Sequence, residues 1–140
     1  MRALVVGASG GIGAALVTAL SARGEVVGLS RRGGGLDVRD EASVAAARGA
    51  LQAGFDLIVV ATGALMIGGV GPEKTLKAVT AEGLSRAFLV NAVGPALVMK
   101  HAVRLMRRDA LCRMAVLSAR VGPIGDNGLG GWYGYRAAKA

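Results

Sequence analysis

Short apolar runs alternate along this chain with longer segments in which apolar residues recur every three or four positions. Each run has the length and β-branched content of a buried strand. We therefore expect strands at 3–6, 26–30, 57–61 and 114–118, and a very short strand at 36–38. Helices are expected between them, at 12–23, from a cap at Asp40 to about 53, and from a cap at Thr80 to about 108.

Two local features modify this pattern. Gly94-Pro95 lies inside the last expected helix, and proline lacks a backbone N–H, so we expect a kink or break there. Only five residues, 31–35, join the second expected strand to the third. A parallel neighbour needs a crossover of about a dozen residues. The segment 36–38 is therefore either not a regular parallel strand or enters the sheet edge for only a residue or two.

Strands that alternate with helices are typical of a parallel sheet with right-handed crossovers. Hydrophobic residues make up 53% of the chain and aromatic residues only 4%, which suits aliphatic strands covered on both faces. The sequence therefore predicts an α/β fold with about five strands. No linker or internal repeat divides it, and we expect one domain over residues 1–140.

Composition narrows the functional classes. The net charge of +8 could indicate a nucleic-acid partner, but the basic residues are scattered singly or in pairs without aromatic interleaving. No apolar run has the length of a membrane span or a signal peptide. We expect a cytoplasmic protein that binds neither nucleic acid nor membranes. No metal site is predicted.

A glycine-rich segment, Gly7-Ala8-Ser9-Gly10-Gly11-Ile12-Gly13, follows the first expected strand and opens the first expected helix. Gly7 suits a tight turn, Gly11 lets the backbone approach a phosphate, and Gly13 allows close packing of helix and strand. The glycines at 7, 10 and 13 fit a second spacing. N–H groups at the start of the helix would then face a dinucleotide pyrophosphate. The sequence predicts a nucleotide site, against the alternative of a purely structural turn.

The end of the second expected strand indicates which dinucleotide binds. NAD sites usually carry an acidic residue there for the ribose 2′-hydroxyl, whereas an arginine accommodates a 2′-phosphate. This chain has Ser30-Arg31-Arg32 and no carboxylate. NADP is therefore favoured over NAD, and the alternative is that both arginines are merely solvated.

Tyr135 and Lys139 are four residues apart near the end of the chain. On a helix this spacing places both side chains on one face. A nearby cation makes a phenol a stronger acid, so Tyr135 could exchange a proton with a carbonyl oxygen. Tyr133 is the rival phenol, but the residue four positions on from it is Ala137. The alternative is a buried tyrosine next to a surface lysine.

In combination these motifs resemble the short-chain dehydrogenase/reductase family over the whole chain. The stretch from Ser118 to Lys139 is most similar to the C-factor-like and sniffer-type carbonyl reductases. The resemblance implies a Rossmann-type doubly wound parallel sheet that is incomplete here, because family members continue past the lysine. It thus implies that the chain is truncated at its C-terminal end, that this piece alone is inactive, and that the full-length parent is a homo-oligomer. The residues that carry the resemblance are Gly7, Gly11, Gly13, Asp37, Val38, Gly63, Asn91, Ser118, Tyr135 and Lys139.

The resemblance also implies individual roles. Lys139 would hydrogen-bond the nicotinamide ribose, and Asn91 would hold a water that relays protons to it, unless Asn91 makes an ordinary polar contact within its helix. Asp37 would meet the adenine edge, unless it caps the following turn. The implied cofactor-binding set is Gly7, Ser9, Gly10, Gly11, Ile12, Gly13, Arg31, Arg32, Asp37, Val38, Gly63, Asn91, Tyr135 and Lys139.

Ser118 would orient the substrate oxygen and complete the catalytic set of Tyr135, Lys139, Ser118 and Asn91. Here the sequence departs from the family pattern, because the residue three positions before Gly122 is Ala119. Adjacent strand residues face opposite sides, so a shift by one place matters unless the strand has ended. The family's Asn-Asn-Ala-Gly run is Val60-Ala61-Thr62-Gly63 here, without the amides.

The sequence thus predicts an NADP-dependent oxidoreductase that acts on a small-molecule carbonyl or secondary alcohol. The alternative is a catalytically silent nucleotide-binding protein with a regulatory or signalling role. The intact Tyr135, Lys139 and Asn91 favour the enzyme, whereas the Ser118 shift and the missing amides favour the alternative.

Overall fold

The computed structural model describes the backbone of residues 1–140 and every side chain except that of Asp126. It contains one parallel sheet of four strands in the order β2-β1-β3-β4. The strands are β1 (Arg2–Val6), β2 (Glu25–Leu29), β3 (Leu57–Val60) and β4 (Arg113–Val116). Leu4 of β1 is in register with Val27 on one side and Ile58 on the other. The predicted α/β class and the parallel sheet are therefore confirmed.

The chain forms two compact units. The first comprises Met1–Thr62 and Pro95–Leu117 and contains the whole sheet. The second comprises Gly63–Gly94 and Ser118–Ala140.

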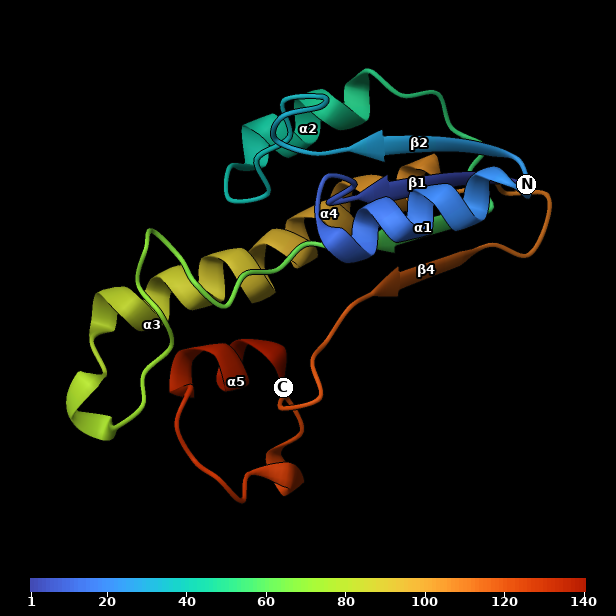
Figure 1. Cartoon of the computed structure of the whole chain (residues 1–140). Helices are drawn as coiled ribbons and strands as arrows, with labels where there is room; N and C mark the ends of the chain where they lie inside the picture. Colours follow the sequence, from blue (N-terminus) through green and yellow to red (C-terminus); the bar gives the residue numbers. More distant parts are fainter. The chain divides into compact units, whose positions relative to one another are not determined.

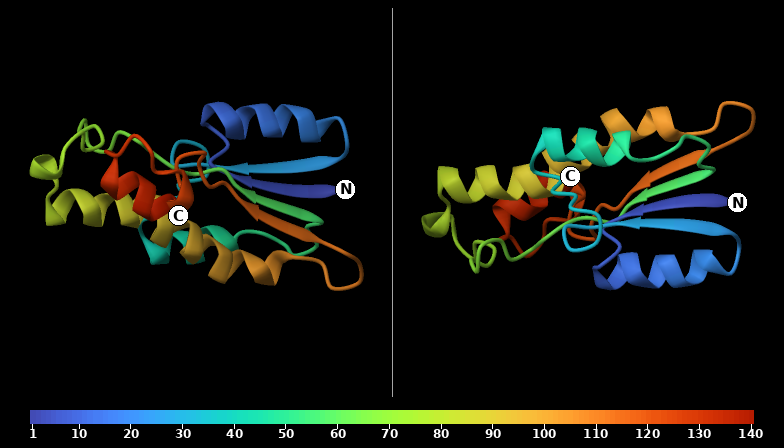
Figure 2. Two further views of the ribbon diagram at one scale, coloured as in Figure 1. Left: turned by 90° about the horizontal axis from the view of Figure 1, so that it is seen from below. Right: turned by 90° about the horizontal axis from the view of Figure 1, so that it is seen from above.

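Helices cover both faces of the sheet in the first unit. These helices are α1 (Gly11–Ser21), α2 (Glu41–Gly49) and α4 (Gly94–Ala102), and a 3₁₀ turn at Val103–Leu105 follows α4. Figure 1 and Figure 2 show α1 on one face and α2 with α4 on the other. This is the layering that right-handed crossovers between parallel strands produce.

The core of the first unit lies between the sheet and the α2/α4 layer. Leu4 and Val6 of β1 belong to this cluster together with Ile58 and Val60 of β3. Each pair is two residues apart because successive strand side chains point to opposite faces. Phe55, just before β3, is fully buried, and the Arg2 guanidinium lies 4.3 Å from the centre of its ring. Aliphatic side chains from strands, helices and loops therefore make up the whole of this cluster except Phe55, as the composition predicts.

The expected third strand at 36–38 does not form, so the sheet has four strands and not five. Leu36 and Val38 are instead buried in the core, with exposed fractions of 4% and 9%. The link from β2 is too short for the crossover that a parallel strand needs. The apolar residues of this segment therefore contribute to the fold by packing rather than by pairing.

The predicted caps are present. The Asp40 carboxylate accepts a hydrogen bond from the backbone N–H of Ala42 at 3.0 Å and begins α2. The Thr80 hydroxyl accepts one from Gly83 at 3.0 Å and begins α3 (Ala81–Phe88) in the second unit. Such caps satisfy N–H groups that have no partner within the helix.

The long helix predicted from Thr80 is interrupted, as expected. After α3 the chain makes a π-helical turn at Leu89–Val93, in which the N–H of Gly94 bonds to the carbonyl of Leu89. Pro95, which has no N–H to donate, follows directly. The second unit also contains α5 (Tyr133–Lys139) and 3₁₀ turns at Leu76–Ala78 and Ile124–Asp126.

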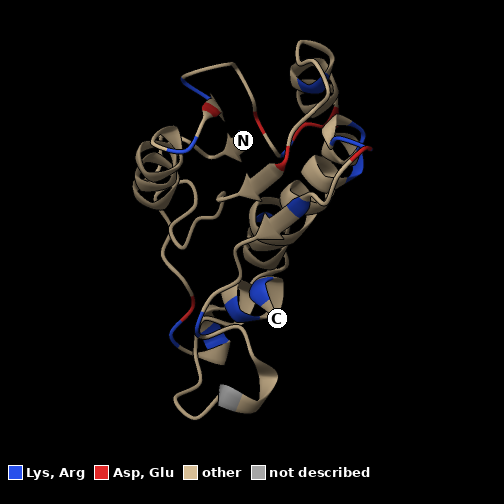
Figure 3. Cartoon of the chain, turned by 90° about the vertical axis from the view of Figure 1, so that its right-hand side faces the viewer, with Lys and Arg blue, Asp and Glu red and all other residues tan. Residues whose placement is uncertain are grey.

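No helix within the described residues is long and apolar enough to cross a membrane. Figure 3 shows Lys and Arg on helices, loops and strand ends, without a single basic run. Several of them pair with acidic groups, such as Arg2 with Glu25 at 3.0 Å and Arg107 with Asp56 at 2.8 Å. Solvent-accessible pairs of this kind add little stability.

We predict that Gly13→Ala destabilises the protein and that Gly11→Ala does not. A Cβ atom at Gly13 would overlap the carbonyl of Gly7, whereas one at Gly11 meets nothing within 4 Å. We expect Gly13→Ala to lower the free energy of unfolding by about 1–3 kcal/mol. Gly11→Ala should leave it unchanged or raise it by up to about 1 kcal/mol. Urea denaturation of both variants checks this, and equal destabilisation would contradict it.

Candidate active site

The glycine-rich turn connects β1 to α1 in the first unit. Gly7 has a φ of +92°, a conformation that favours glycine, and its N–H donates to the carbonyl of Leu29 at 2.8 Å. A Cβ at this position would lie 2.9 Å from the carbonyl carbon of Ala61, the residue that follows β3. The turn therefore has the tight, glycine-dependent form that the sequence predicts.

The N-terminus of α1 suits an anionic ligand. Gly10 is the N-cap residue and gives no side-chain hydrogen bond, and the first turn contains no acidic residue. Nothing lies within 4 Å of the place where Gly11 would carry a side chain, so a ligand can approach its backbone. The N–H groups and partial positive charge at this end of the 11-residue helix are complementary to phosphate.

A further polar group lies beside this turn. The Thr62 hydroxyl oxygen is buried and has no hydrogen-bond partner among the described residues. The backbone N of Thr62 would lie 3.1 Å from a Cβ at Gly7, so this residue adjoins the glycine turn. Buried hydroxyls are usually hydrogen-bonded, so an unpaired one here fits a site that takes a polar ligand. The residues present thus fit a bound dinucleotide.

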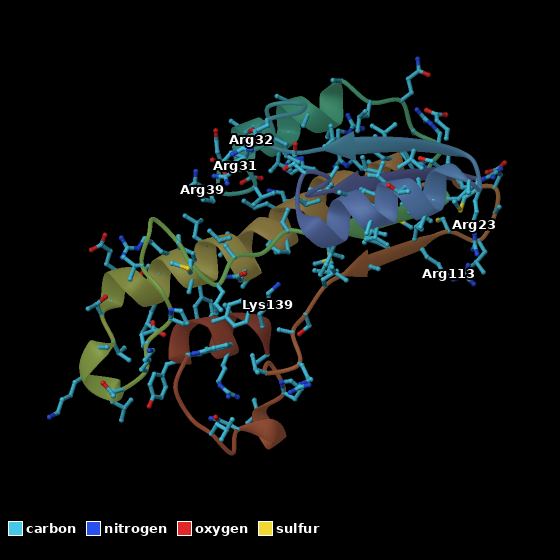
Figure 4. The ribbon with its side chains drawn as sticks, viewed as in Figure 1. Arg23, Arg31, Arg32, Arg39, Arg113 and Lys139 are labelled. Atoms are coloured by element: carbon cyan, nitrogen blue, oxygen red, sulfur yellow. The ribbon has the colours of Figure 1, made fainter. Side chains whose placement is uncertain are left out.

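Arg31 and Arg32 are both exposed and follow β2 after Ser30. Figure 4 shows them together with Arg39 beyond the carboxyl end of β2, whereas Arg23 lies at the opposite end of the sheet. Arg39 is engaged by Asp37, because its Nε lies 2.9 Å from the carboxylate. The exposed guanidinium groups of Arg31 and Arg32 therefore remain at the position where a 2′-phosphate would bind.

The Asp37 carboxylate takes part in local interactions. It accepts hydrogen bonds from the side chain of Arg39 and, at 3.0 Å, from the Arg39 backbone N–H. The Arg39 side-chain hydrogen bond is the main reason that the pKa of Asp37 is lowered to about 2. The capping of the following turn, the alternative considered from the sequence, is what this carboxylate does in the structure. Val38 is buried in the core.

In the second unit, Lys139 and Asn91 meet at Gly63. A Cβ at Gly63 would lie 3.0 Å from Lys139 Nζ and 3.2 Å from Asn91 Oδ1, so the absence of a side chain leaves room for both groups. Lys139 is buried, with an exposed fraction of 7%. Burial disfavours the charged form and lowers the pKa of Lys139. Three residues far apart in the sequence thus come together in this unit.

Asn91 lies in the π-helical turn and is 4% exposed. Its Oδ1 accepts a hydrogen bond from the N–H of Ala64 at 2.9 Å. Its Nδ2 donates to the carbonyls of Ala64 at 2.9 Å and Ala87 at 3.1 Å. The Asn91 amide therefore joins the loop after β3 to the helix, which the sequence does not reveal. π-Helical turns occur frequently at functional sites.

Ser118 lies in the loop after β4, since that strand ends at Val116. The alternation of strand side chains therefore does not decide which of Ser118 and Ala119 would face a substrate. The Ser118 hydroxyl donates to the backbone carbonyl of Lys139 at 2.5 Å. A Cβ at Gly122 would overlap the same carbonyl, so this loop packs closely against the end of α5.

Tyr135 lies in the middle of α5 and makes an edge-to-face contact with Trp132, with ring centres 6.4 Å apart. Trp132 has a φ of +55° and is the residue before the helix. Glu73 holds this end of α5. Its backbone carbonyl accepts from the Trp132 N–H at 2.5 Å, and its carboxylate accepts from the Gly134 N–H at 3.2 Å. Sequence analysis missed Glu73, because no local pattern marks a loop glutamate that contacts a helix 61 residues away.

Comparison with known proteins gives matches in sequence and in structure. No model of a protein family matches the chain. A stretch of 57 residues, 41% of this chain and 34% of the relative, is 39% identical to C-signal from Myxococcus xanthus. A short-chain dehydrogenase/reductase from Burkholderia multivorans, solved with bound NADP, matches with a TM-score of 0.83 at 28% identity. That match covers 99% of this chain and 67% of the solved one.

A small-chain dehydrogenase solved in complex with NADPH is also similar, with a TM-score of 0.81 and 26% identity over 99% of this chain and 58% of that chain. The predicted resemblance to short-chain dehydrogenase/reductases is therefore confirmed over nearly the whole chain. The Rossmann-type arrangement of the sheet and helices agrees with these oxidoreductases.

We predict that Asn91→Ala strongly destabilises the second unit. The substitution removes the side-chain partner of the partly buried Ala64 backbone groups and of the buried Ala87 carbonyl. We expect the free energy of unfolding to fall by about 2–4 kcal/mol. Asn127→Ala is the matched control, because Asn127 is exposed, and should change it by less than about 0.5 kcal/mol. Chemical denaturation measures both, and a small effect of Asn91→Ala would show that these bonds add little stability.

Proposed function

We propose that the protein containing this chain is an NADP-dependent oxidoreductase that acts on a carbonyl compound or a secondary alcohol. The observation that carries the proposal is the meeting of Lys139 and Asn91 at Gly63. Lys139 belongs to α5, the helix that also bears Tyr135. Solved relatives with bound NADP and NADPH support the choice of cofactor. Bound NADPH would supply the hydride for carbonyl reduction.

The family resemblance implies cofactor-binding roles for residues of each unit. The backbone of Gly7 and of residues 9–13 would bind the pyrophosphate, and Arg31 and Arg32 would bind the 2′-phosphate. Asp37 and Val38 would border the adenine. Gly63, Asn91 and Lys139 would contact the nicotinamide ribose, as the family resemblance implies.

Proton transfer would depend on Tyr135. Its hydroxyl would donate a proton to the carbonyl oxygen in reduction and accept one in oxidation. The Lys139 ammonium would stabilise the phenolate that this leaves. Asn91 would hold a water that returns the proton, using an Oδ1 lone pair beyond the one that Ala64 occupies. Ser118 would have to turn its hydroxyl away from the Lys139 carbonyl before it could donate to a substrate oxygen.

The second candidate is a nucleotide-binding protein that regulates or signals without catalysis. The engagement of Ser118 with backbone and the absence of amides at Val60 and Ala61 favour it. The two candidates differ in one measurable respect. Both bind NADPH, but only the enzyme oxidises it when a carbonyl compound is present.

We predict that Tyr135→Phe in the full protein removes carbonyl reduction. Loss of a general acid lowers kcat by about a hundredfold or more, because the hydroxyl that delivers the proton is gone. Tyr133→Phe is the matched control, since it removes a phenol from the same helix, and should keep kcat within about twofold. NADPH oxidation against a panel of ketones and aldehydes measures both rates. Equal rates for wild type and Tyr135→Phe would refute the assignment.

We also predict that Arg31→Asp weakens binding of NADPH more than binding of NADH. The substitution replaces a charge-assisted contact to the 2′-phosphate with repulsion, and should raise the NADPH Kd by about tenfold or more. Arg23→Asp makes the same change of charge at the opposite end of the sheet and should alter neither Kd by more than about twofold. Fluorescence titration with each cofactor gives the ratio, and an unchanged ratio in Arg31→Asp would overturn the assignment of this site.

A further inference from the structure

The residue that precedes α5 has a backbone conformation that its own side chain disfavours. Trp132 has a φ of +55° and a ψ of +38°, in the left-handed region. Among the described residues, no other non-glycine residue has a positive φ. A bulky residue rarely adopts this conformation and keeps it only where surrounding contacts fix it. The turn that begins α5 therefore depends on contacts from outside the helix.

Glu73 supplies these contacts from a loop that is distant in sequence. Its backbone carbonyl accepts from the Trp132 N–H at 2.5 Å, and its Oε2 accepts from the Gly134 N–H at 3.2 Å. A Cβ at Gly134 would lie 3.0 Å from Oε1, so both oxygens of the Glu73 carboxylate lie against this turn. Glu73 thus bonds to two of the three residues that directly precede Tyr135.

The orientation of the Tyr135 ring depends on the same turn. Its backbone follows Gly134 directly, and its ring meets the Trp132 ring edge-to-face, with an angle of 81° between the planes. Tyr135 also borders a cavity of about 630 Å³, which Glu73 lines as well. Every residue that lines this cavity belongs to the second unit. Because the ring lies at the edge of a cavity, its position depends strongly on the contacts at the start of α5.

We propose that Glu73 is a positioning residue for Tyr135, because it fixes the strained turn before α5 and so determines where the Tyr135 hydroxyl lies. This inference rests on the proposed function, in which that hydroxyl transfers a proton. Glu73 would act through Trp132 and Gly134, and its role requires no contact with substrate or cofactor. A displacement of a reacting group by about 1 Å can cost about a hundredfold in rate.

The test measures carbonyl reduction by three variants of the full protein. Glu73→Ala removes the acceptor of the Gly134 N–H and should lower kcat by about tenfold or more, with KM and the NADPH Kd within about threefold of wild type. Glu73→Gln keeps an oxygen acceptor and should retain kcat within about threefold. Glu82→Ala is the matched control, because the Glu82 side chain is 77% exposed and pairs with Arg86 on the helix surface. It should change kcat by less than about twofold.

A double variant shows whether Glu73 acts through Tyr135. In the Tyr135→Phe background, Glu73→Ala should change the remaining rate by less than about twofold, because no hydroxyl is left to position. The same loss of rate in both backgrounds would overturn the proposal. An unchanged kcat in Glu73→Ala, in a protein whose wild type reduces carbonyl compounds, would overturn it while leaving the proposed function intact.

The emission of Trp132, the single tryptophan of the chain, tests the anchoring without turnover. It is recorded well below the unfolding midpoint, so that a loss of stability alone does not change it. The emission maximum should move to longer wavelength in Glu73→Ala, because a released indole is more exposed to water, and should stay unchanged in Glu73→Gln and Glu82→Ala. A wild type that reduces no carbonyl compound would reject the enzyme, and the shift would still support the anchoring. Unchanged emission in Glu73→Ala would overturn the proposal whatever the activity.

Discussion

In each unit the chain approaches itself so closely that no Cβ atom fits between the segments, and the functional groups are arranged around these approaches. In the first unit Gly13 packs on the carbonyl of Gly7, which sets the start of α1 against the end of β1. In the second unit Gly63 leaves space for Lys139 and Asn91. Gly122 likewise leaves space for the backbone carbonyl of Lys139, the last residue of α5. A side chain at Gly13 or Gly122 would displace backbone, and one at Gly63 would crowd the Lys139 and Asn91 side chains. Close-packed protein interiors tolerate such overlap poorly.

The two units supply different kinds of chemistry. The first presents backbone N–H groups and exposed guanidinium groups, which bind anions. The second contains a phenol, a buried ammonium group and a buried amide, which can hold and move protons. Burial of Lys139 lowers its pKa, because the loss of solvation opposes the charge that the proposed reaction uses. Any anionic group that binds near Lys139 would favour the charged form.

The hydrogen bonds of the second unit explain how a short helix carries these groups. α5 has seven residues, too few to be stable alone in water. Glu73 binds its first turn, and Ser118 binds its last carbonyl. Both contacts come from loops that are distant in sequence. The positions of Tyr135 and Lys139 are thus determined by tertiary contacts as much as by helical spacing.

Features that depend on neighbouring residues could be predicted from the sequence. The strand at 57–60, the caps at Asp40 and Thr80, the glycine turn and the irregular helix before Pro95 follow from side-chain periodicity and backbone chemistry. Tertiary structure decided that 36–38 packs instead of pairing, that Ser118 donates to Lys139, and that Glu73 anchors α5. It also formed the cavity beside Tyr135. These contacts join segments far apart in the chain, and no local pattern records which distant groups will meet.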